Sequence, residues 1–372
     1  MSKGLSLYLD LLRLLAALEV FVYHLTSFPA IGVQPAWWNG YGREAVTIFF
    51  VLSGFVIRHA AASGDRDVES FAASRLARVY SVAIPCLALT LIFDTIGHHL
   101  APGLYAGVAP AGSPWPRLAI GAMMLNETWV SVQMLSNTPY WSLSYEACYY
   151  ALFAALFYFG GRTRWLLAGA CALIAGPRIL LLFPIWLLGW WAYRERLSAR
   201  LPLWGAALLF VQPAAMIAAY THWNFAGIDR AFLESLLGHH VYRDDLAWSR
   251  YVLSDTVLGV SIAVHLLGAR RLGDRLLPIL SPFGMPIKLG AGQSFTLYLL
   301  HQPALLFAGA CLAAVPLGAA RGLAVAVATL LIVAIVAMAT EAQRRRLKAL
   351  ILALFEHVRH VRRRSRTGFS PR

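Results

Sequence analysis

Long apolar runs, separated by short polar or basic segments, repeat along the whole chain. A helix needs about 20 apolar residues to cross the hydrocarbon core of a bilayer, with a lower limit near 17. Ten runs come close to this length, and they cover residues 5–26, 44–62, 79–97, 141–160, 164–177, 179–193, 203–220, 251–268, 293–315 and 322–340. The pattern therefore predicts an all-α polytopic membrane protein with about ten transmembrane helices.

Two of these runs are shorter than an ordinary span. They lie at 164–177 and 179–193, and Gly176 and Pro177 mark their junction. An eleventh candidate, "RLAIGAMMLNETWV" at 117–130, is also short and is partly polar. The count is therefore ten spans, or eleven if 117–130 crosses as well.

The distribution of Lys and Arg decides between these counts, because basic residues collect on the cytoplasmic side of a membrane protein. With ten spans, both termini and all the basic clusters lie on one side. These clusters are Arg58/Arg66/Arg75/Arg78, Arg162/Arg164, Arg194/Arg196/Arg200, Arg270/Arg271/Arg275 and the C-terminal run. With eleven spans, every cluster after residue 130 falls on the wrong side. We therefore predict ten spans, both termini in the cytoplasm, and an outer segment at 98–140 that does not cross.

Composition supports a membrane protein, since 59% of the residues are hydrophobic and 13% are charged, against about 25% charged in soluble domains. The net charge of +14 lies in loops and in the tail, so topology explains it without a nucleic-acid partner. We expect a transmembrane domain at 1–341 and a basic amphipathic cytoplasmic tail at 342–372. The four cysteines lie in apolar runs without CxxC spacing, which argues against disulfides and a zinc site.

The first predicted span carries two groups that lipid disfavours, Arg13 and His24. Eleven helical residues place them within roughly 20° of each other and about 16 Å apart along the axis. A charge at the bilayer centre costs about 2.5–3.5 kcal/mol, so both side chains should face protein or a polar cavity. The plainer alternative is that His24 is an interfacial residue and that Arg13 pairs with Asp10.

Further polar groups lie in or beside four other spans. Ser53 stands in "FFVLSGF", where a Ser-Gly pair is also common in close helix packing. Arg75 and Arg78 are one turn apart at the cytoplasmic entrance to a span, where they can hold phosphates or serve only as anchors. Glu146 lies within a span, as does His301, and a carboxylate there is a functional candidate.

Taken together, these motifs resemble the acyltransferase 3 family of integral-membrane O-acyltransferases. The matching motifs are the Arg13-to-His24 spacing after "LYLDLLR", "FFVLSGF", Arg75 with Arg78, "WSLSYE", "FPIWLLGWWAY" and "SFTLYLLHQP". They occur in the family's order over roughly residues 5–340. One departure is Glu19, an acidic residue in the first span where the family pattern suggests an apolar one.

The resemblance implies that an acyl-CoA, with acetyl as the expected acyl group, enters from the cytoplasm. Its phosphates would lie near Arg75 and Arg78, and its pantetheine arm would pass Arg13, Ser53 and His301. No metal is implied. The location would be a bacterial inner membrane, with the lipid bilayer as surroundings.

The resemblance also implies the chemistry and the acceptor. His24 would act as general base on a hydroxyl of an outer-side glycan or glycoconjugate, or would itself carry the acyl group. Arg13 would steady the oxyanion or the CoA, and Glu146 would orient a histidine or carry a proton. The acceptor would meet Tyr140, Trp141 and Ser142, although such aromatic residues are equally typical of a membrane-interface belt.

Three alternatives compete with this interpretation. A glycan or lipid transporter would explain the interrupted spans and the buried charges, although we find no inverted repeat. His239 and Asp244 have the H-x4-D spacing of glycerolipid acyltransferases, but they lie in a loop predicted to be outside. A third possibility is a histidine-centred membrane-bound acyltransferase in which His301 is catalytic, and the surrounding motifs fit it less well.

Overall fold

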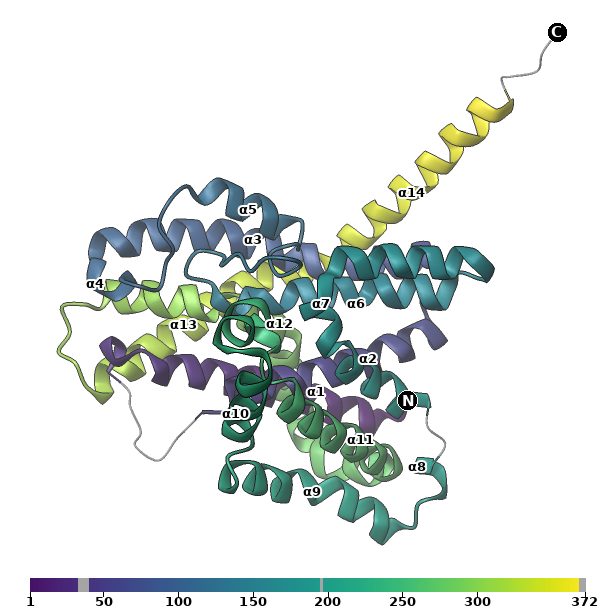
Figure 1. Ribbon diagram of the computed structural model, residues 1–372, viewed down its shortest axis with the longest axis horizontal. Helices are drawn as coiled ribbons and strands as arrows, with labels where there is room; N and C mark the ends of the chain where they lie inside the picture. The colour runs from purple at the N-terminus through teal and green to yellow at the C-terminus, as the bar shows by residue number, and fades with distance from the viewer. Residues whose placement is uncertain (33–39, 195–196, 368–372) are drawn as a thin grey trace.

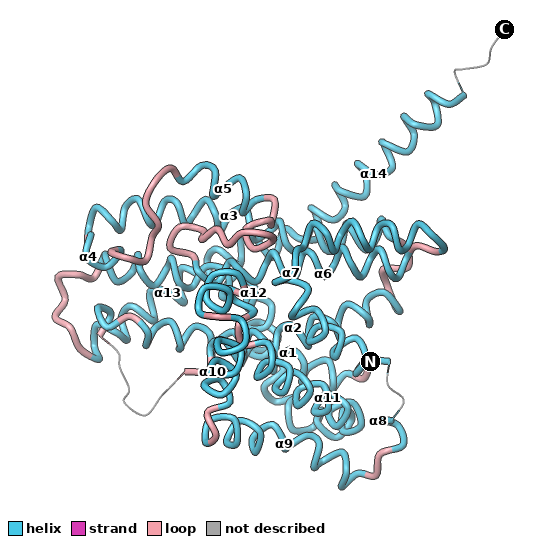
Figure 2. The backbone as a smooth tube through the Cα atoms, in the orientation of Figure 1, coloured by secondary structure: helices cyan, strands magenta, loops and turns pink. Residues whose placement is uncertain are grey.

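The computed structural model describes residues 1–32, 40–194 and 197–367. The all-helical prediction is confirmed, because the described residues form fourteen α-helices joined by loops and short turns, with no β-strand among them (Figures 1 and 2). The helices are α1 (Lys3–Ser27), α2 (Gly42–Ser63), α3 (Val68–Leu100), α4 (Pro102–Tyr105), α5 (Pro114–Ala122), α6 (Trp141–Tyr158), α7 (Gly161–Arg194), α8 (Leu197–Arg200), α9 (Leu203–His222), α10 (Phe225–Leu237), α11 (Val252–Leu280), α12 (Gly284–Cys311), α13 (Ala319–Thr340) and α14 (Arg344–Thr367).

Six helical stretches in the described part of the chain are long and apolar enough to cross a membrane. They are Gly42–Ser63, Val68–Leu100, Gly161–Arg194, Leu203–His222, Val252–Cys311 and Ala319–His360. The fifth stretch contains both α11 and α12. Two predicted spans fall outside this set, because α1 carries four charged side chains and α6 is rich in tyrosine. The structure is thus a multi-helix membrane protein.

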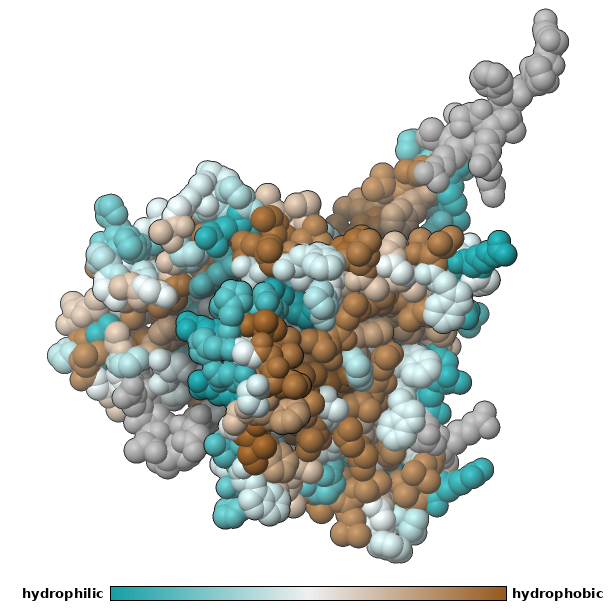
Figure 3. Space-filling view, viewed as in Figure 1, coloured by the Kyte–Doolittle hydropathy of each residue, from teal (hydrophilic) through white to brown (hydrophobic). Residues whose placement is uncertain are grey.

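The outer surface of the helix bundle is apolar. In Figure 3 hydrophobic residues cover most of the face over α9 and α11. On α9, Leu208 and Val211 are 57% and 59% exposed, and on α13 Leu331 and Ile335 are 59% and 63% exposed. A soluble protein rarely leaves such a large apolar surface in water, so we assign this surface to lipid.

The segment at 117–130 does not form a membrane span. Its helix, α5, has nine residues, which gives a length of about 14 Å at 1.5 Å per residue. The hydrocarbon core of a bilayer is about 30 Å thick. The chain after α5 continues in turns, bends and irregular segments as far as residue 137, so the described chain forms no membrane-length helix between α3 and α6.

Both ends of α7 lie near the same end of α2. Tyr158, just before α7, donates a hydrogen bond of 2.5 Å to the backbone oxygen of Asp65, which follows α2. Tyr193, near the end of α7, has its hydroxyl 3.2 Å from His59 Nδ1 in the last turns of α2. The chain must therefore reverse its direction within α7.

The reversal occurs at Gly176, whose φ of 76° and ψ of 172° are not helical. A Cβ atom at this glycine would come within 3.0 Å of the backbone oxygen of Thr128, so a larger residue would be strained in conformation and in space. The sequence runs 164–177 and 179–193 thus correspond to two separate arms of α7.

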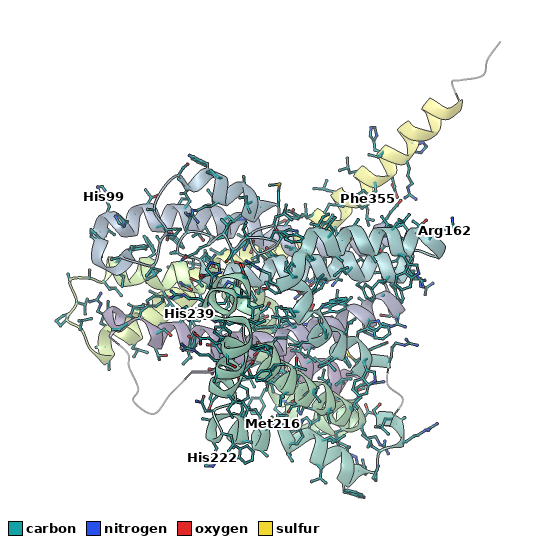
Figure 4. All side chains as sticks on the ribbon, viewed as in Figure 1. His99, Arg162, Met216, His222, His239 and Phe355 are labelled. Carbon is teal, nitrogen blue, oxygen red and sulfur yellow. The ribbon has the colours of Figure 1, made fainter. Side chains whose placement is uncertain are left out.

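Figure 4 shows the start of α7, at Arg162, and the end of α3, at His99, on opposite sides of the helix bundle.

The centre of the bundle is α12, which packs against α1, α3 and α13. Every residue from 296 to 306 of this helix is buried. A helix that is buried all round can keep polar side chains only if they find partners in the protein. His301 and Gln302 both lie on this buried stretch. Their side chains therefore need polar partners inside the bundle.

Candidate active site

Two histidines meet at the centre of the bundle. His24 Nδ1 lies 2.9 Å from the backbone oxygen of Val20 and 3.1 Å from His301 Nε2. His301 Nδ1 lies 2.9 Å from the backbone oxygen of Leu297. A nitrogen that faces a carbonyl oxygen must carry the proton, so this network assigns the proton to Nδ1 in both rings. His24 Nε2 is then left unprotonated, with its lone pair free to act as a base.

A cavity of about 320 Å³, named here the His24 pocket, lies beside this pair. Its walls include His24, Arg43, Trp141, Trp248 and Tyr298. The rings of Trp141 and Trp248 are stacked, with centroids 5.0 Å apart and 8° between their planes. The pocket therefore combines a potential base with a flat aromatic surface, which suits an amphipathic ring.

Arg43 is fixed in the wall of the His24 pocket by several partners. It binds the carboxylate of Asp255 and the hydroxyl of Tyr220, and its Nη2 donates to Glu44 Oε1 at 2.7 Å. Its guanidinium also lies over the ring of Tyr251, 4.2 Å from the centroid. A guanidinium with so many partners is held in one position, so this wall is preformed.

A buried carboxyl group supports the aromatic wall from behind. Glu127, in the segment between α5 and α6, accepts hydrogen bonds from Trp248 and from Ser131, the latter at 2.9 Å. Burial raises the pKa of the Glu127 carboxyl to about 8, against the lowering effects of Ser131 and of Arg178. Arg178 Nη1 lies 3.9 Å from this carboxyl. Trp248 is therefore held by a polar group that the sequence pattern did not single out.

A second cavity, named here the Glu146 cavity, is narrow, with a volume of about 60 Å³. It brings together the predicted site residues Arg13, Ser53, Arg75, Arg78, Ser142 and Glu146. Glu146 accepts a hydrogen bond of 3.0 Å from Ser53 Oγ and another from the hydroxyl of Tyr150. Ser53 in turn accepts from Trp186 Nε1 at 3.2 Å. These side chains from α2, α6 and α7 form one polar network.

A third cavity of about 470 Å³, named here the Arg344 cavity, continues from the second. Arg13 and Arg78 line both, so the two cavities are neighbours. The charged residues around it are Asp10, Arg13, Arg78, Lys288, Glu341 and Arg344. The Asp10 carboxylate lies 3.6 Å from Arg13. The cavity wall has four cations and two carboxylates, and this excess of positive charge favours the binding of an anionic group.

Arg75 and Arg78 differ in their partners. Arg75 Nη2 lies 3.2 Å from Asp65 Oδ2, so part of its charge is already neutralised. Arg78 forms no salt bridge within the described residues, and the buried Nε atoms of both arginines have no hydrogen-bond partner there. Of the pair that the sequence suggested, Arg78 is therefore the better placed to receive an external anion.

Two of the predicted residues line none of the three cavities. His301 is fully buried behind His24, and Tyr140 is fully buried with its hydroxyl bonded to the backbone oxygen of Gly121 at 2.9 Å. Other lining residues were missed by the sequence patterns. Arg344 was interpreted only as part of the basic C-terminal run, and Lys288 was not singled out at all. Tyr298 lies within the motif "SFTLYLLHQP", one turn before His301, but was given no role.

The H-x4-D pattern does not form a catalytic pair. His239, on the segment after α10 (Figure 4), binds Glu234, and its side chain is 62% exposed. The carboxylate of Asp244 lies instead 3.8 Å from His240. Neither group lines the three cavities described above, so the glycerolipid acyltransferase alternative has no structural support.

A family model and a curated protein are similar to this chain. A family model described as an acyltransferase domain matches residues 6–339. Acyltransferase MdmB of Streptomyces mycarofaciens is 30% identical over 187 residues, and the match covers 46% of this chain and 46% of that protein. The chain thus spans about half the length of this curated relative. No solved structure matches it.

Proposed function

The chain belongs to the acyltransferase 3 family, and from this premise we propose that it is a membrane-embedded O-acyltransferase. It moves an acetyl group from cytoplasmic acetyl-CoA to a hydroxyl of a glycan or glycoconjugate on the outer side of a bacterial inner membrane. The observation that carries the proposal is the series of three cavities, which begins among cations at the Arg344 cavity and ends at His24.

The donor enters through the Arg344 cavity. Its phosphates bind the guanidinium groups of Arg78 and Arg344 and the ammonium of Lys288, since charge-assisted hydrogen bonds to phosphate are strong. The thin pantetheine arm follows the narrow Glu146 cavity past Arg13 and Ser53. The phosphates stay near water while the thioester advances toward the buried histidines.

His24 acts as general base. Its Nε2 takes the proton from the acceptor hydroxyl, and the hydroxyl oxygen attacks the thioester carbonyl carbon. When the tetrahedral intermediate collapses, the C–S bond breaks and the CoA sulfur leaves as a thiolate, which receives the proton that His24 carried. His301 does not hold the donor in this scheme but positions His24 through the 3.1 Å contact between their rings.

The remaining residues hold the two substrates. Glu146 keeps Ser53 and Tyr150 in place along the donor path, and Arg13 balances charge where the Glu146 and Arg344 cavities meet. The stacked rings of Trp141 and Trp248 support the apolar face of the acceptor ring. Ser142 lines the Glu146 cavity, whereas Tyr140 is buried behind the cavities and has no direct contact with either substrate in this proposal.

The test is a titration of the purified full-length protein with acetyl-CoA, together with a transfer assay that follows radiolabelled acetyl groups into envelope material. Arg78→Gln should weaken acetyl-CoA binding by about tenfold or more, because a hydrogen bond to a charged group is worth about 1.5–3 kcal/mol. His24→Ala should bind acetyl-CoA normally and transfer no label. Arg162→Gln, which removes an exposed arginine remote from the cavities, is the matched control.

The outcomes separate the competing functions. If acetyl-CoA does not bind at millimolar concentration, the donor assignment fails and a transporter that uses the interrupted α7 becomes the better explanation. If His24→Ala transfers label at the normal rate, another group is the base. If Arg162→Gln weakens binding as much as Arg78→Gln, the effect reflects general charge and not the Arg344 cavity.

A further inference from the structure

Tyr298 stands between the His24 pocket and the Glu146 cavity. Among the described residues it is the one that lines both. The side chain is 7% exposed and belongs to the buried stretch of α12. The two spaces therefore both reach this side chain and are neighbours at this point.

A hydrogen bond joins Tyr298 to α6 at the place where the two spaces meet. The Tyr298 hydroxyl lies 2.7 Å from Ser142 Oγ, and Ser142 is also 7% exposed. The ring is further held by Phe49, whose ring meets it edge-on at a centroid distance of 5.4 Å. Side chains from α12, α6 and α2 thus meet across the passage, and one hydroxyl–hydroxyl bond joins α12 to α6.

The closed point lies next to the proposed base. Tyr298 precedes His301 by one turn on α12, and His301 touches His24. An acyl group in the Glu146 cavity must pass Tyr298 to reach a hydroxyl in the His24 pocket. Without a closure, water from the His24 pocket would meet the thioester, and the molecule would contain a continuous polar path through the bundle.

We propose that Tyr298 and Ser142 form a gate that separates a donor chamber from an acceptor chamber. The bond is closed in the absence of substrates, and the acyl end of the donor displaces the Tyr298 hydroxyl from Ser142 only when it passes. The identity of the passing group rests on the proposed function. The closure itself can be measured without any transfer.

The experiment uses thiol labelling of the full-length protein in proteoliposomes. Its four cysteines are first replaced, and single cysteines are introduced by Val56→Cys in the Glu146 cavity and by Ala226→Cys in the His24 pocket. A membrane-impermeant thiol reagent is added from the side on which Ala226→Cys reacts. With Tyr298 intact, Val56→Cys should react slowly from that side.

Changes at Tyr298 should open the path in a graded way. Tyr298→Phe keeps the ring and removes the bond to Ser142, so labelling of Val56→Cys should become a few-fold faster, up to about tenfold. Tyr298→Ala removes the ring as well and should increase the rate further. Tyr80→Ala removes a tyrosine that lines neither space and should leave the rate unchanged.

Each result has a consequence. Fast labelling of Val56→Cys with Tyr298 intact, or an equal rate in all the Tyr298 variants, would overturn the gate. Monodisperse elution in detergent checks that each variant is folded, and Tyr298→Phe stands in if Tyr298→Ala is not. Faster labelling in the variants without any increase in acceptor-free acetyl-CoA hydrolysis would keep the gate and reject acetyl-CoA as the group that passes it.

Discussion

At the scale of single residues, hydrogen bonds decide which nitrogen of His24 is available for chemistry. Val20 and His301 both face Nδ1, so the opposite nitrogen, Nε2, keeps its lone pair. A neutral imidazole accepts a proton near neutral pH only if the correct tautomer is present. In the proposed mechanism, the role of His301 is therefore to present a hydrogen-bond acceptor to His24 Nδ1.

This arrangement predicts different effects for two substitutions of His301. His301→Ala leaves Nδ1 of His24 with one partner, and we expect kcat for acetyl transfer to fall by about 10–100-fold, since positioned acid–base groups contribute about 10²–10⁴. His301→Gln can again present an oxygen to Nδ1 and should recover part of the rate. The KM for acetyl-CoA should stay unchanged in both variants, as steady-state kinetics with radiolabelled donor will show.

A merely structural role for His301 would give another pattern. Both variants would then lose thermal stability, and the pH dependence of kcat would keep its shape. Equal loss of rate in His301→Gln and His301→Ala, together with a raised KM for acetyl-CoA, would support the donor contact that the sequence motif suggested.

The site residues show how far a sequence pattern reaches. Arg13, Ser53 and Glu146 were predicted because polar groups inside an apolar span are energetically costly and often functional. The structure brings these three residues together at one cavity. Tyr298 and Trp248 were not predicted, since aromatic residues are common in every membrane helix. Their role depends on partners more than 100 residues away in sequence, such as Ser142 and Trp141, and no periodicity contains that information.

At the scale of helices, α2 and α7 approach each other through glycines. A Cβ atom at Gly189 would lie 1.8 Å from the backbone oxygen of Val51, and one at Gly54 would lie 2.0 Å from the backbone oxygen of Trp186. Small residues allow this close contact in membranes. The contact also sets the position of Ser53, which lies beside Gly54.

This packing predicts that Gly189→Ala destabilises the protein. Added atoms in a close-packed contact cost about 1–3 kcal/mol, and here the obstacle is backbone, which cannot rotate away. We expect a lower midpoint of thermal unfolding in detergent, measured by the loss of monodisperse protein on heating. Gly169→Ala, in the same helix but with open space around its Cβ, should be neutral or slightly stabilising. An equal loss in both variants would contradict the close-contact explanation.

Helix positions were largely predictable, and helix breaks were only partly so. Hydropathy placed the long runs because a bilayer sets their length. It gave the two short runs around Gly176 as separate pieces, and the φ of 76° at this glycine explains the break. The sequence could not say that both ends of α7 lie beside the end of α2, since that follows from contacts between side chains far apart in the chain, such as Tyr193 and His59.

At the scale of the whole molecule, the reversal within α7 bears on the topology that we propose. If each of the two arms joined at Gly176 crosses the membrane, α7 crosses twice. With α1, α2, α3, α6, α9, α11, α12 and α13 as the other proposed spans, the total is then ten. An even number leaves both ends of the bundle on one side, which is also where the positive-inside rule puts the basic clusters. If α7 crossed once, the total would be nine, and α14 would lie on the side opposite to the N-terminus.

The difference between ten spans and nine predicts which of four exposed positions a reagent outside the cell can reach. In a protein without its native cysteines, Lys3→Cys, Arg162→Cys and His357→Cys should resist an impermeant thiol reagent added to intact cells, and Asp244→Cys should react. Permeabilised cells should label all four, which controls for expression. Labelling of His357→Cys but not Lys3→Cys in intact cells would show an odd number of spans. The two arms of α7 would then form one crossing, and the donor entrance beside α14 would face outward. Arg344 could not then bind a cytoplasmic donor while His24 meets an acceptor from the outer side, as we propose.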